Sequence, residues 1–147
     1  MANEIKRTTT LSWSKNGASI IATVTESIDQ TGENVIENVQ IISDASEAIN
    51  LGDVSTPKYV MFKNMTTAWG SLTAAEKVAT GFTGESAAAD YASAHKVYIG
   101  NNSPADAENT TFKLEPGNGV SIVTEQSAWY ALANNFDVNL LVLAIEA

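Results

Sequence analysis

The sequence contains no cysteine and only one histidine, His95. The lack of cysteine excludes disulfide bonds, thiolate metal sites and a cysteine nucleophile from this chain. A Ser-His-Asp triad would have to use His95, and no Gly-x-Ser-x-Gly turn occurs. We interpret His95 as a residue at the edge of a strand, because no second histidine is present to share a metal ion with it. We therefore predict a protein that is not an enzyme and that binds no cofactor.

Basic residues are also scarce: 8 Lys and Arg stand against 17 Asp and Glu, a net charge of −9. Such a surface repels a phosphate backbone, so we expect no nucleic-acid partner. No apolar run reaches the roughly 18 residues of a membrane helix, and residues 1–7 lack the apolar stretch of a secretion signal. We therefore expect a protein made in the host cytoplasm that stays soluble and has no membrane partner.

Short apolar runs separated by turn residues are the main pattern in the 147 residues, of which 44% are apolar. In the first run Ile5, Leu11 and Trp13 share one face, which predicts a half-buried strand. The other predicted strands cover residues 18–25, 35–43, 59–63, 96–99, 112–115, 120–123, 129–132 and 138–145. Eight to ten strands at this spacing are typical of a sandwich or barrel. We predict a single domain, residues 1–147.

The C-terminal third predicts a β-meander. Asn118 and Gly119 favour a tight hairpin turn, which would place residues 112–114 opposite residues 120–122. The last strand, residues 138–145, is apolar on both faces, so both faces must be covered. We expect the cover to be a second sheet or a neighbouring molecule.

Residues 66–95 break this pattern, because they are rich in Ala and Ser. Thr73 and Glu76 match a capping box, and Ser86 is a second possible helix start. We predict an insertion between two strands that carries one or two short helices. Its apolar face is poorly developed, so we expect either a surface excursion or a segment that packs on a neighbouring subunit.

Four residues are candidates for contact with a partner: Trp69, Lys6, Arg7 and Lys15. Trp69 follows the insertion's first residues and could serve as a packing anchor or an exposed contact, whereas Trp13 and Trp129 lie in strand patterns and suit a core or an interface. The three basic residues near the N-terminus are available to pair with an acidic partner surface. The loop at residues 29–34 is rich in oxygen ligands but lacks the EF-hand pattern, which leaves only an irregular calcium loop open.

The order of turns and strands after residue 47 carries a resemblance. In sequence order the features are a Leu-Gly-Asp turn at residues 51–53, a strand ending in Lys63 and Asn64, a strand ending in Ile-Gly at residues 99–100, a Leu-x-Pro-Gly turn at residues 114–117, a Tyr-Ala strand and an apolar last strand. In this order residues 47–147 resemble a group of small virion proteins of tailed bacteriophages, from which the insertion at residues 66–95 departs. The resemblance implies a structural, non-enzymatic particle protein.

We therefore predict an all-β protein, an antiparallel β-sandwich of jelly-roll type with a short helical or loop insertion at about residues 66–95. We expect a capsid decoration or cement protein on the outer surface of a phage head, in contact with the major capsid protein or other virion proteins and with itself as a homotrimer. A head-fibre or tail component is an alternative. A carbohydrate-binding adhesin with Trp69 or Trp129 as a stacking platform, and a glycan hydrolase with two convergent carboxylates, also stay open.

Overall fold

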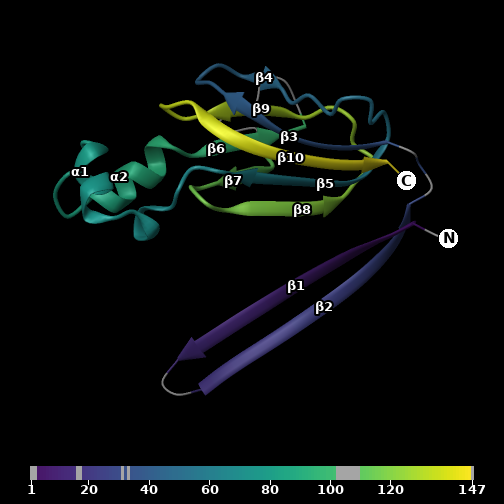
Figure 1. Cartoon of the computed structure of the whole chain (residues 1–147), viewed down its shortest axis with the longest axis horizontal. Coiled ribbons are helices and arrows are strands. Elements are labelled where there is room, and N and C mark those ends of the chain that lie inside the picture. The colour runs from purple at the N-terminus through teal and green to yellow at the C-terminus, as the bar shows by residue number, and fades with distance from the viewer. Residues whose placement is uncertain (1–2, 16–17, 31, 33, 102–109, 147) are drawn as a thin grey trace.

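The computed structural model describes residues 3–15, 18–30, 32, 34–101 and 110–146. Strands dominate the described residues, and every strand pairing is antiparallel. Figure 1 shows a body of two layered sheets, a small helical region at one end of it, and a long hairpin that projects from the other end. The prediction of an all-β protein built from antiparallel sheets is therefore confirmed.

Eight strands form the body, four in each sheet. The first sheet, here the β10 sheet, has the order β3 (Val35–Ile42), β10 (Val138–Glu146), β5 (Pro57–Asn64) and β8 (Gly119–Val123). The second sheet, here the β9 sheet, has the order β4 (Glu47–Ala48), β9 (Tyr130–Ala133), β6 (Val97–Gly100) and β7 (Phe112–Leu114). Consecutive strands therefore alternate between the sheets from β3 to β6 and again from β7 to β10, whereas β6 and β7 are neighbours in the β9 sheet.

The hydrophobic core lies between the two sheets. Side chains with no exposed surface come from both, among them Phe62 and Leu140 on one side and Ile99 and Ala131 on the other. The Phe62 and Trp129 rings meet edge to face with centroids 5.3 Å apart. Trp129 is thus a core residue, one of the two roles that its strand pattern predicted.

The prediction of a hairpin at Asn118 and Gly119 is wrong. β7 pairs with β6 in one sheet, whereas β8 pairs with β5 in the other, so residues 115–118 cross between the sheets. The left-handed residue of this crossing is Gly117, with φ 80°. A local turn signal marks a change of direction, but the choice of partner strand depends on packing with distant segments. In place of the predicted meander, the strands from β7 to β10 alternate between the two sheets.

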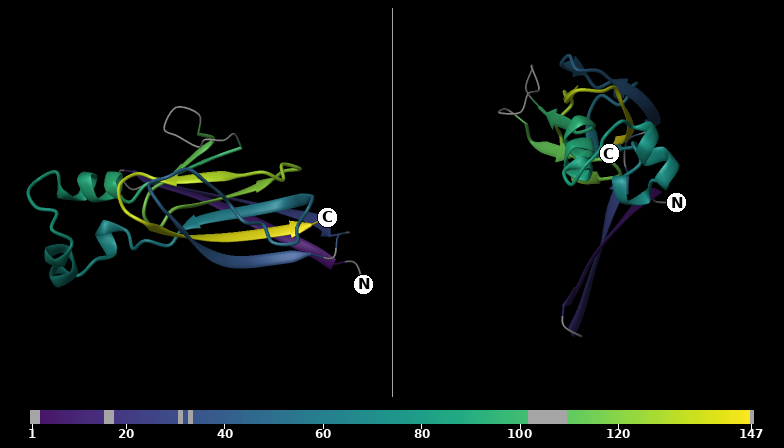
Figure 2. Two further views of the ribbon diagram at one scale, coloured as in Figure 1. Left: turned by 90° about the horizontal axis from the view of Figure 1, so that it is seen from above. Right: turned by 90° about the vertical axis from the view of Figure 1, so that its left-hand side faces the viewer.

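The projecting hairpin, here called the arm, consists of β1 (Asn3–Lys15) and β2 (Ala18–Gln30), paired along their whole length. The right-hand view of Figure 2 shows that it leads away from the body. The prediction of a half-buried first strand is wrong, because Leu11 is 68% and Trp13 47% exposed. Within the described part of the chain no second layer covers this two-stranded ribbon.

The last strand, β10, is the second strand of its sheet and is covered on one face only. Val138, Leu140 and Val142 point into the core and are at most 1% exposed. Leu141, Leu143 and Ile145 point outward and are half-buried. The described residues supply no cover for this outer side. Of the two covers that we expected, a second sheet covers one face of β10, and a neighbouring molecule on the other face stays a prediction.

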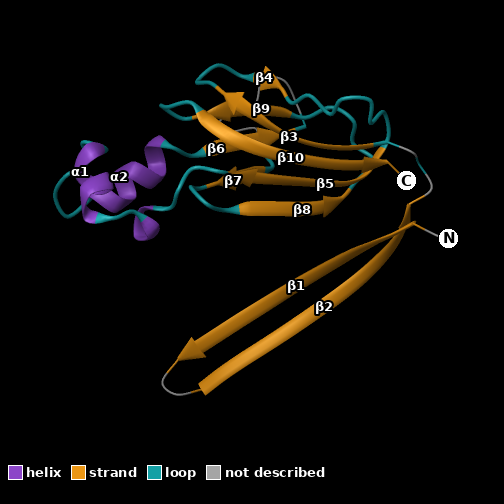
Figure 3. Cartoon of the chain, viewed as in Figure 1, coloured by secondary structure: helices purple, strands orange, loops and turns teal. Residues whose placement is uncertain are grey.

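The helical insertion is confirmed, as Figure 3 shows by its colours. It contains a 3-10 turn (Trp69–Ser71), α1 (Ala74–Ala79) and α2 (Ala87–Ala94). α1 starts with the predicted capping box. The Glu76 carboxylate accepts from the Thr73 N–H, and the Thr73 hydroxyl oxygen accepts from the Glu76 N–H. Gly81 and Gly84 both adopt positive φ in the connection between the helices.

Removal of β10 by truncation after Asn135 should abolish cooperative folding. The truncation removes Val138, Leu140 and Val142 from the core, at roughly 1.5–3 kcal/mol each, together with both ladders of β10, from a domain whose stability is of order 10 kcal/mol. Deletion of residues 1–30 is the matched control, and it should leave a folded body because the arm lies outside the core. Thermal unfolding followed by circular dichroism measures both. A truncated chain that melts at the parent temperature would contradict the central position of β10.

Candidate assembly surfaces

The arm has one apolar and one polar face, because its register places residues of like character opposite one another. Thr9 faces Val24, Leu11 faces Ala22 and Trp13 faces Ile20. We call these six residues the apolar face of the arm; Ile20 is 61% and Val24 59% exposed. Cross-strand pairs of this kind stabilise a sheet when a second layer covers them.

The opposite face of the arm is rich in hydroxyl groups. The Thr8 and Thr25 hydroxyls are 3.3 Å apart, and those of Thr10 and Thr23 are 3.2 Å apart. Ile21, opposite Ser12, is the large apolar side chain that the structure describes on this side. The arm is therefore a β-ribbon with one hydrophilic face and one apolar face that no described residue covers.

A second apolar surface lies on the outer side of the β10 sheet. Val39 is opposite Leu141, Val35 is opposite Ile145, and Leu143 is opposite Met61, all pointing away from the core. The edge strand β3 contributes the most exposed of these side chains: Val35 55%, Val39 56% and Ile41 67%. We call this surface the outer face of the β10 sheet.

Charge is distributed unevenly between the arm and the body. Residues 1–30 contain three basic and three acidic residues, so the whole net charge of −9 belongs to the rest of the chain. Lys6 is exposed, and the Arg7 Nη1 atom lies 3.6 Å from Glu26 Oε2. The Lys15 side chain lies outside the described residues. The arm is therefore neutral, and Arg7 is already compensated within it.

Trp69 lies in the insertion, apart from the basic residues of the arm. Its ring is partly buried, with the Tyr91 ring centroid 5.4 Å away and the Lys77 Nζ atom 5.4 Å from its own centroid. The Tyr91 hydroxyl donates to the Thr67 carbonyl over 3.1 Å, and burial raises the pKa of Tyr91. The structure shows these packing contacts of Trp69, and a contact of its exposed part with a partner stays a prediction.

Trp69 and Tyr91 belong to an aromatic cluster that also includes Phe82, His95 and Phe136. The His95 ring stacks on Phe136 with centroids 4.9 Å apart, and Phe82 meets Tyr91 edge to face at 5.7 Å. The insertion thus has an apolar face of its own, contrary to the expectation from its alanine content. Sequence reasoning missed Phe136 because it lies about 40 residues beyond the helices it packs against.

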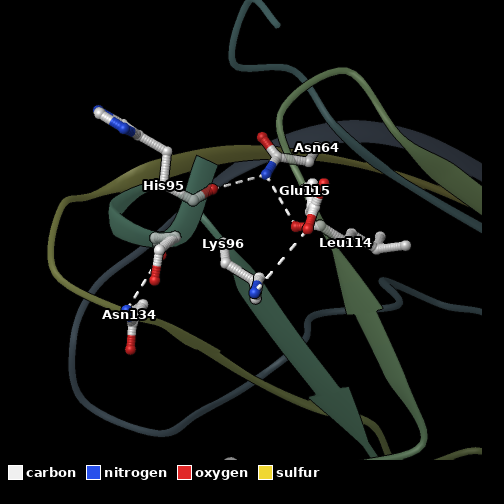
Figure 4. Close-up of polar contacts among 7 residues, drawn as sticks. Asn64, His95, Lys96, Leu114, Glu115 and Asn134 are labelled. Atoms are coloured by element: carbon white, nitrogen blue, oxygen red, sulfur yellow. Dashed lines mark hydrogen bonds and ion pairs between the residues drawn. The ribbon is translucent and has the colours of Figure 1, made fainter. Parts of the chain in front are cut away.

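Asn64, at the end of β5, joins the insertion to the sheets. Its side chain is fully buried, and its amide donates to the His95 carbonyl at 2.8 Å and to the Leu114 carbonyl at 3.2 Å. Its Oδ1 atom accepts from the Thr66 N–H at 3.0 Å. In Figure 4 the Asn64 amide points at both carbonyls, while Lys96 reaches toward Glu115 and Asn134 toward the chain before His95. Both polar atoms of the Asn64 side chain, the amide nitrogen and the carbonyl oxygen, therefore have hydrogen-bond partners within the protein.

A depression of about 360 Å³ opens beside this junction. Backbone and small polar side chains of residues 63–68, Ser71 and residues 116–118 line it. Neither Trp69 nor Trp129 is among these residues, and Trp129 is only 4% exposed, so the prediction of Trp129 as a stacking platform is wrong.

The described residues hold no cluster suited to a metal ion and no helix suited to a membrane. No three His, Asp or Glu side chains among them come together as a metal site. Residues 31 and 33 of the oxygen-rich loop lie outside that description. None of the described helices is both long and apolar enough to cross a membrane.

The Glu146 carboxylate holds the start of β3 to the neighbouring loop of the body. It accepts from the Ser55 hydroxyl at 2.8 Å and from the Asn34 side-chain amide at 2.8 Å. The Glu146 N–H also donates to the Asn34 carbonyl at 2.9 Å, and the Asn34 amide donates to the Asp53 carbonyl at 3.1 Å. Asn34 directly precedes β3, so these contacts fix the point at which the chain enters the body.

Comparison of the chain with protein-family models, with curated proteins and with solved structures returned no match.

Replacement of Asn64 by leucine should destabilise the protein by on the order of 3 kcal/mol. The substitution leaves the carbonyls of His95 and Leu114 and the N–H of Thr66 without a partner, and buried unsatisfied groups cost about 1–3 kcal/mol each. Asn135→Leu is the control, because Asn135 is exposed and a surface change of this kind costs within about 0.5 kcal/mol. Urea unfolding measures both variants. Equal midpoints for the two would show that the Asn64 bonds contribute little.

The Glu146 contacts predict acid sensitivity. Hydrogen bonding from Ser55, with further bonds from Thr56 and Asn34, lowers the pKa of Glu146 below its ordinary value of 4.5. A carboxyl whose pKa is lower in the folded than in the unfolded state adds stability above the unfolded pKa and loses it as pH falls through the folded pKa. The parent should therefore lose melting temperature below about pH 4.5, whereas Glu146→Gln should lose less over the same interval. Parallel decline of both proteins in a pH series of melting curves would rule out this contribution.

Proposed function

We propose that this chain is a structural virion protein of jelly-roll fold that decorates or cements the head of a tailed bacteriophage. The strand order supports the jelly roll. The neighbours β3 and β10, β4 and β9, β5 and β8, and β6 and β7 are successive pairs of one long hairpin whose turn lies between β6 and β7. These pairs alternate between the two sheets, which is the arrangement of eight strands in two Greek keys that jelly rolls use, a fold frequent in viral capsid and lectin domains.

The observation that carries an assembly role is the arm. A ribbon of two 13-residue strands with exposed Leu11, Trp13 and Ile20 is costly for a monomer, because a two-stranded hairpin is at best marginally stable in water. Large unpartnered apolar surfaces of this kind mark sites of protein contact. A protein that assembles on a particle gains from both the arm and the outer face of the β10 sheet.

The phage-specific part of the proposal rests on the resemblance of residues 47–147. The residues that carry it occupy structurally demanding positions: Gly52 of the Leu-Gly-Asp turn has φ 59°, and Asn64 is the buried link to the insertion. The acidic body is suited to the outside of a capsid, where no DNA is contacted. We propose the major capsid protein, other virion proteins and further copies of the chain as partners, with a homotrimer as the assembly.

A head-fibre or tail component would use the same arm and is the alternative within this class. A carbohydrate-binding adhesin is favoured by one observation, the depression beside Asn64. The side chains of Thr66, Thr67, Ser71 and Asn118 at its rim offer hydroxyl and amide groups of the kind that bind sugar hydroxyls.

Mass spectrometry of purified particles against clarified lysate tests the proposed function. We expect the chain in the particles at a fixed ratio to the major capsid protein, and we expect it to remain with the heads when heads and tails are separated. Recovery with tails alone would favour the alternative component. Absence from purified particles, together with saturable binding on a glycan array, would favour the adhesin and overturn the virion role.

A further inference from the structure

We propose that the apolar face of the arm docks on the outer face of the β10 sheet of a second copy of this chain, so that copies exchange arms. This inference rests on the proposed assembly role and names the surfaces that perform it. Both surfaces belong to the same sequence, and each is uncovered in the described structure. A second copy is the partner that supplies a cover for both at once.

The two surfaces match in kind and in size. Sheets pack face to face through apolar side chains, and both surfaces are β-faces of this type. The 9 residues of β10 span about 30 Å and the arm is about 10 Å wide, so one arm docked along β10 covers about 300 Å² on each partner. A contact of this length includes the Arg7–Glu26 ion pair, which lies on the same face of the arm next to Thr9 and Val24. A pair that exchanges both arms buries about 1,200 Å² in all, the lower end of the range for specific stable interfaces. The 13-residue strands of the arm are long enough to cross the whole face.

Charge favours this contact over others between copies. Two bodies that each carry the full −9 repel one another, whereas the arm has no net charge. The outer face of the β10 sheet is balanced as well: among the outward positions of β3, β10 and β5 the charged residues are Glu37 and Lys63. The arm therefore lets acidic molecules join through two neutral apolar faces.

The arm diverges from its own body. Asn34 is bonded through its backbone and its side chain to Glu146, and through its side chain to Asp53, which fixes the start of β3. In Figure 1 and in the right-hand view of Figure 2 the arm leads away from the body. In this arrangement its apolar face is open to a neighbour, and the outer face of its own β10 sheet is left open as well.

The chain lacks cysteine, so single cysteines can test the contact directly. Thr9→Cys places a thiol on the apolar face of the arm, and Val39→Cys places one on the outer face of the β10 sheet. The two variants, one carrying an affinity tag, are mixed and treated with a short bismaleimide. We expect a crosslinked heterodimer, with Thr10→Cys on the opposite face of the same strand as the control, which should crosslink several-fold less.

Charge substitutions test the same contact by mass. Light scattering of the parent should show an oligomer, and Leu11→Lys on the arm or Val39→Lys on the sheet should each weaken self-association roughly tenfold or more. Ile21→Lys, on the polar face of the arm, is the matched control and should leave the mass unchanged. All of these positions are exposed, so melting curves should show that the variants fold like the parent.

Three outcomes would overturn the proposal. A monomeric parent whose Thr9→Cys/Val39→Cys double variant crosslinks within one chain would show that the arm covers its own sheet. A parent that stays monomeric and uses its arm only when purified capsid protein is added would assign the arm to that protein. An oligomer with no preference for Thr9 over Thr10 in crosslinking would place the interface elsewhere.

These experiments use the purified protein and are independent of particle analysis. A monomer found on virions would sink arm exchange and leave the virion role intact. An arm-exchanged oligomer that is absent from virions would support this inference and sink the virion role.

Discussion

The pairing of β10 on both of its edges is the interaction on which the rest of this structure depends. β10 bonds to β3 along one edge and to β5 along the other, which brings together residues from both ends of the body. Its inward side chains form the centre of the core, its outward ones form the middle of the outer face, and Glu146 at its end holds Asn34 at the start of β3. One strand therefore sets the core, the entry of the chain into the body and the surface that we propose receives an arm.

The apolar surfaces left open by this arrangement link stability to assembly. A surface that is buried only in an oligomer stabilises the fold by mass action, and this stabilisation rises with the logarithm of the concentration of free copies or partners. The same surfaces would favour aggregation in a protein without charge, and the acidic body opposes that by repulsion between copies. Neutral contact faces on an acidic molecule thus allow one mode of contact and disfavour the others.

The insertion has a different role from the one that its composition suggested. Its aromatic cluster, in which His95 contacts both Tyr91 and Phe136, gives it an internal packing surface, and Asn64 joins it to both sheets. Single apolar side chains such as Val78 stay exposed on it. The extended apolar faces lie instead on the arm and on the β10 sheet, so the proposed contact between copies uses these two surfaces.

The sequence by itself determined the strands other than the two-residue β4, the capping box of α1, the position of the insertion and the apolar character of both faces of β10, because alternation and helix capping depend on residues a few positions apart. The tertiary structure decided which strands pair, so that β7 and β8 cross between sheets although Asn118 and Gly119 favour a hairpin. It also decided which apolar faces are covered. Apolar residues at every second position of a strand show that one face needs a cover, but which segment covers it depends on residues distant in the sequence. The β9 sheet covers Val142 and Phe136 covers His95, whereas nothing within the described chain covers Leu11.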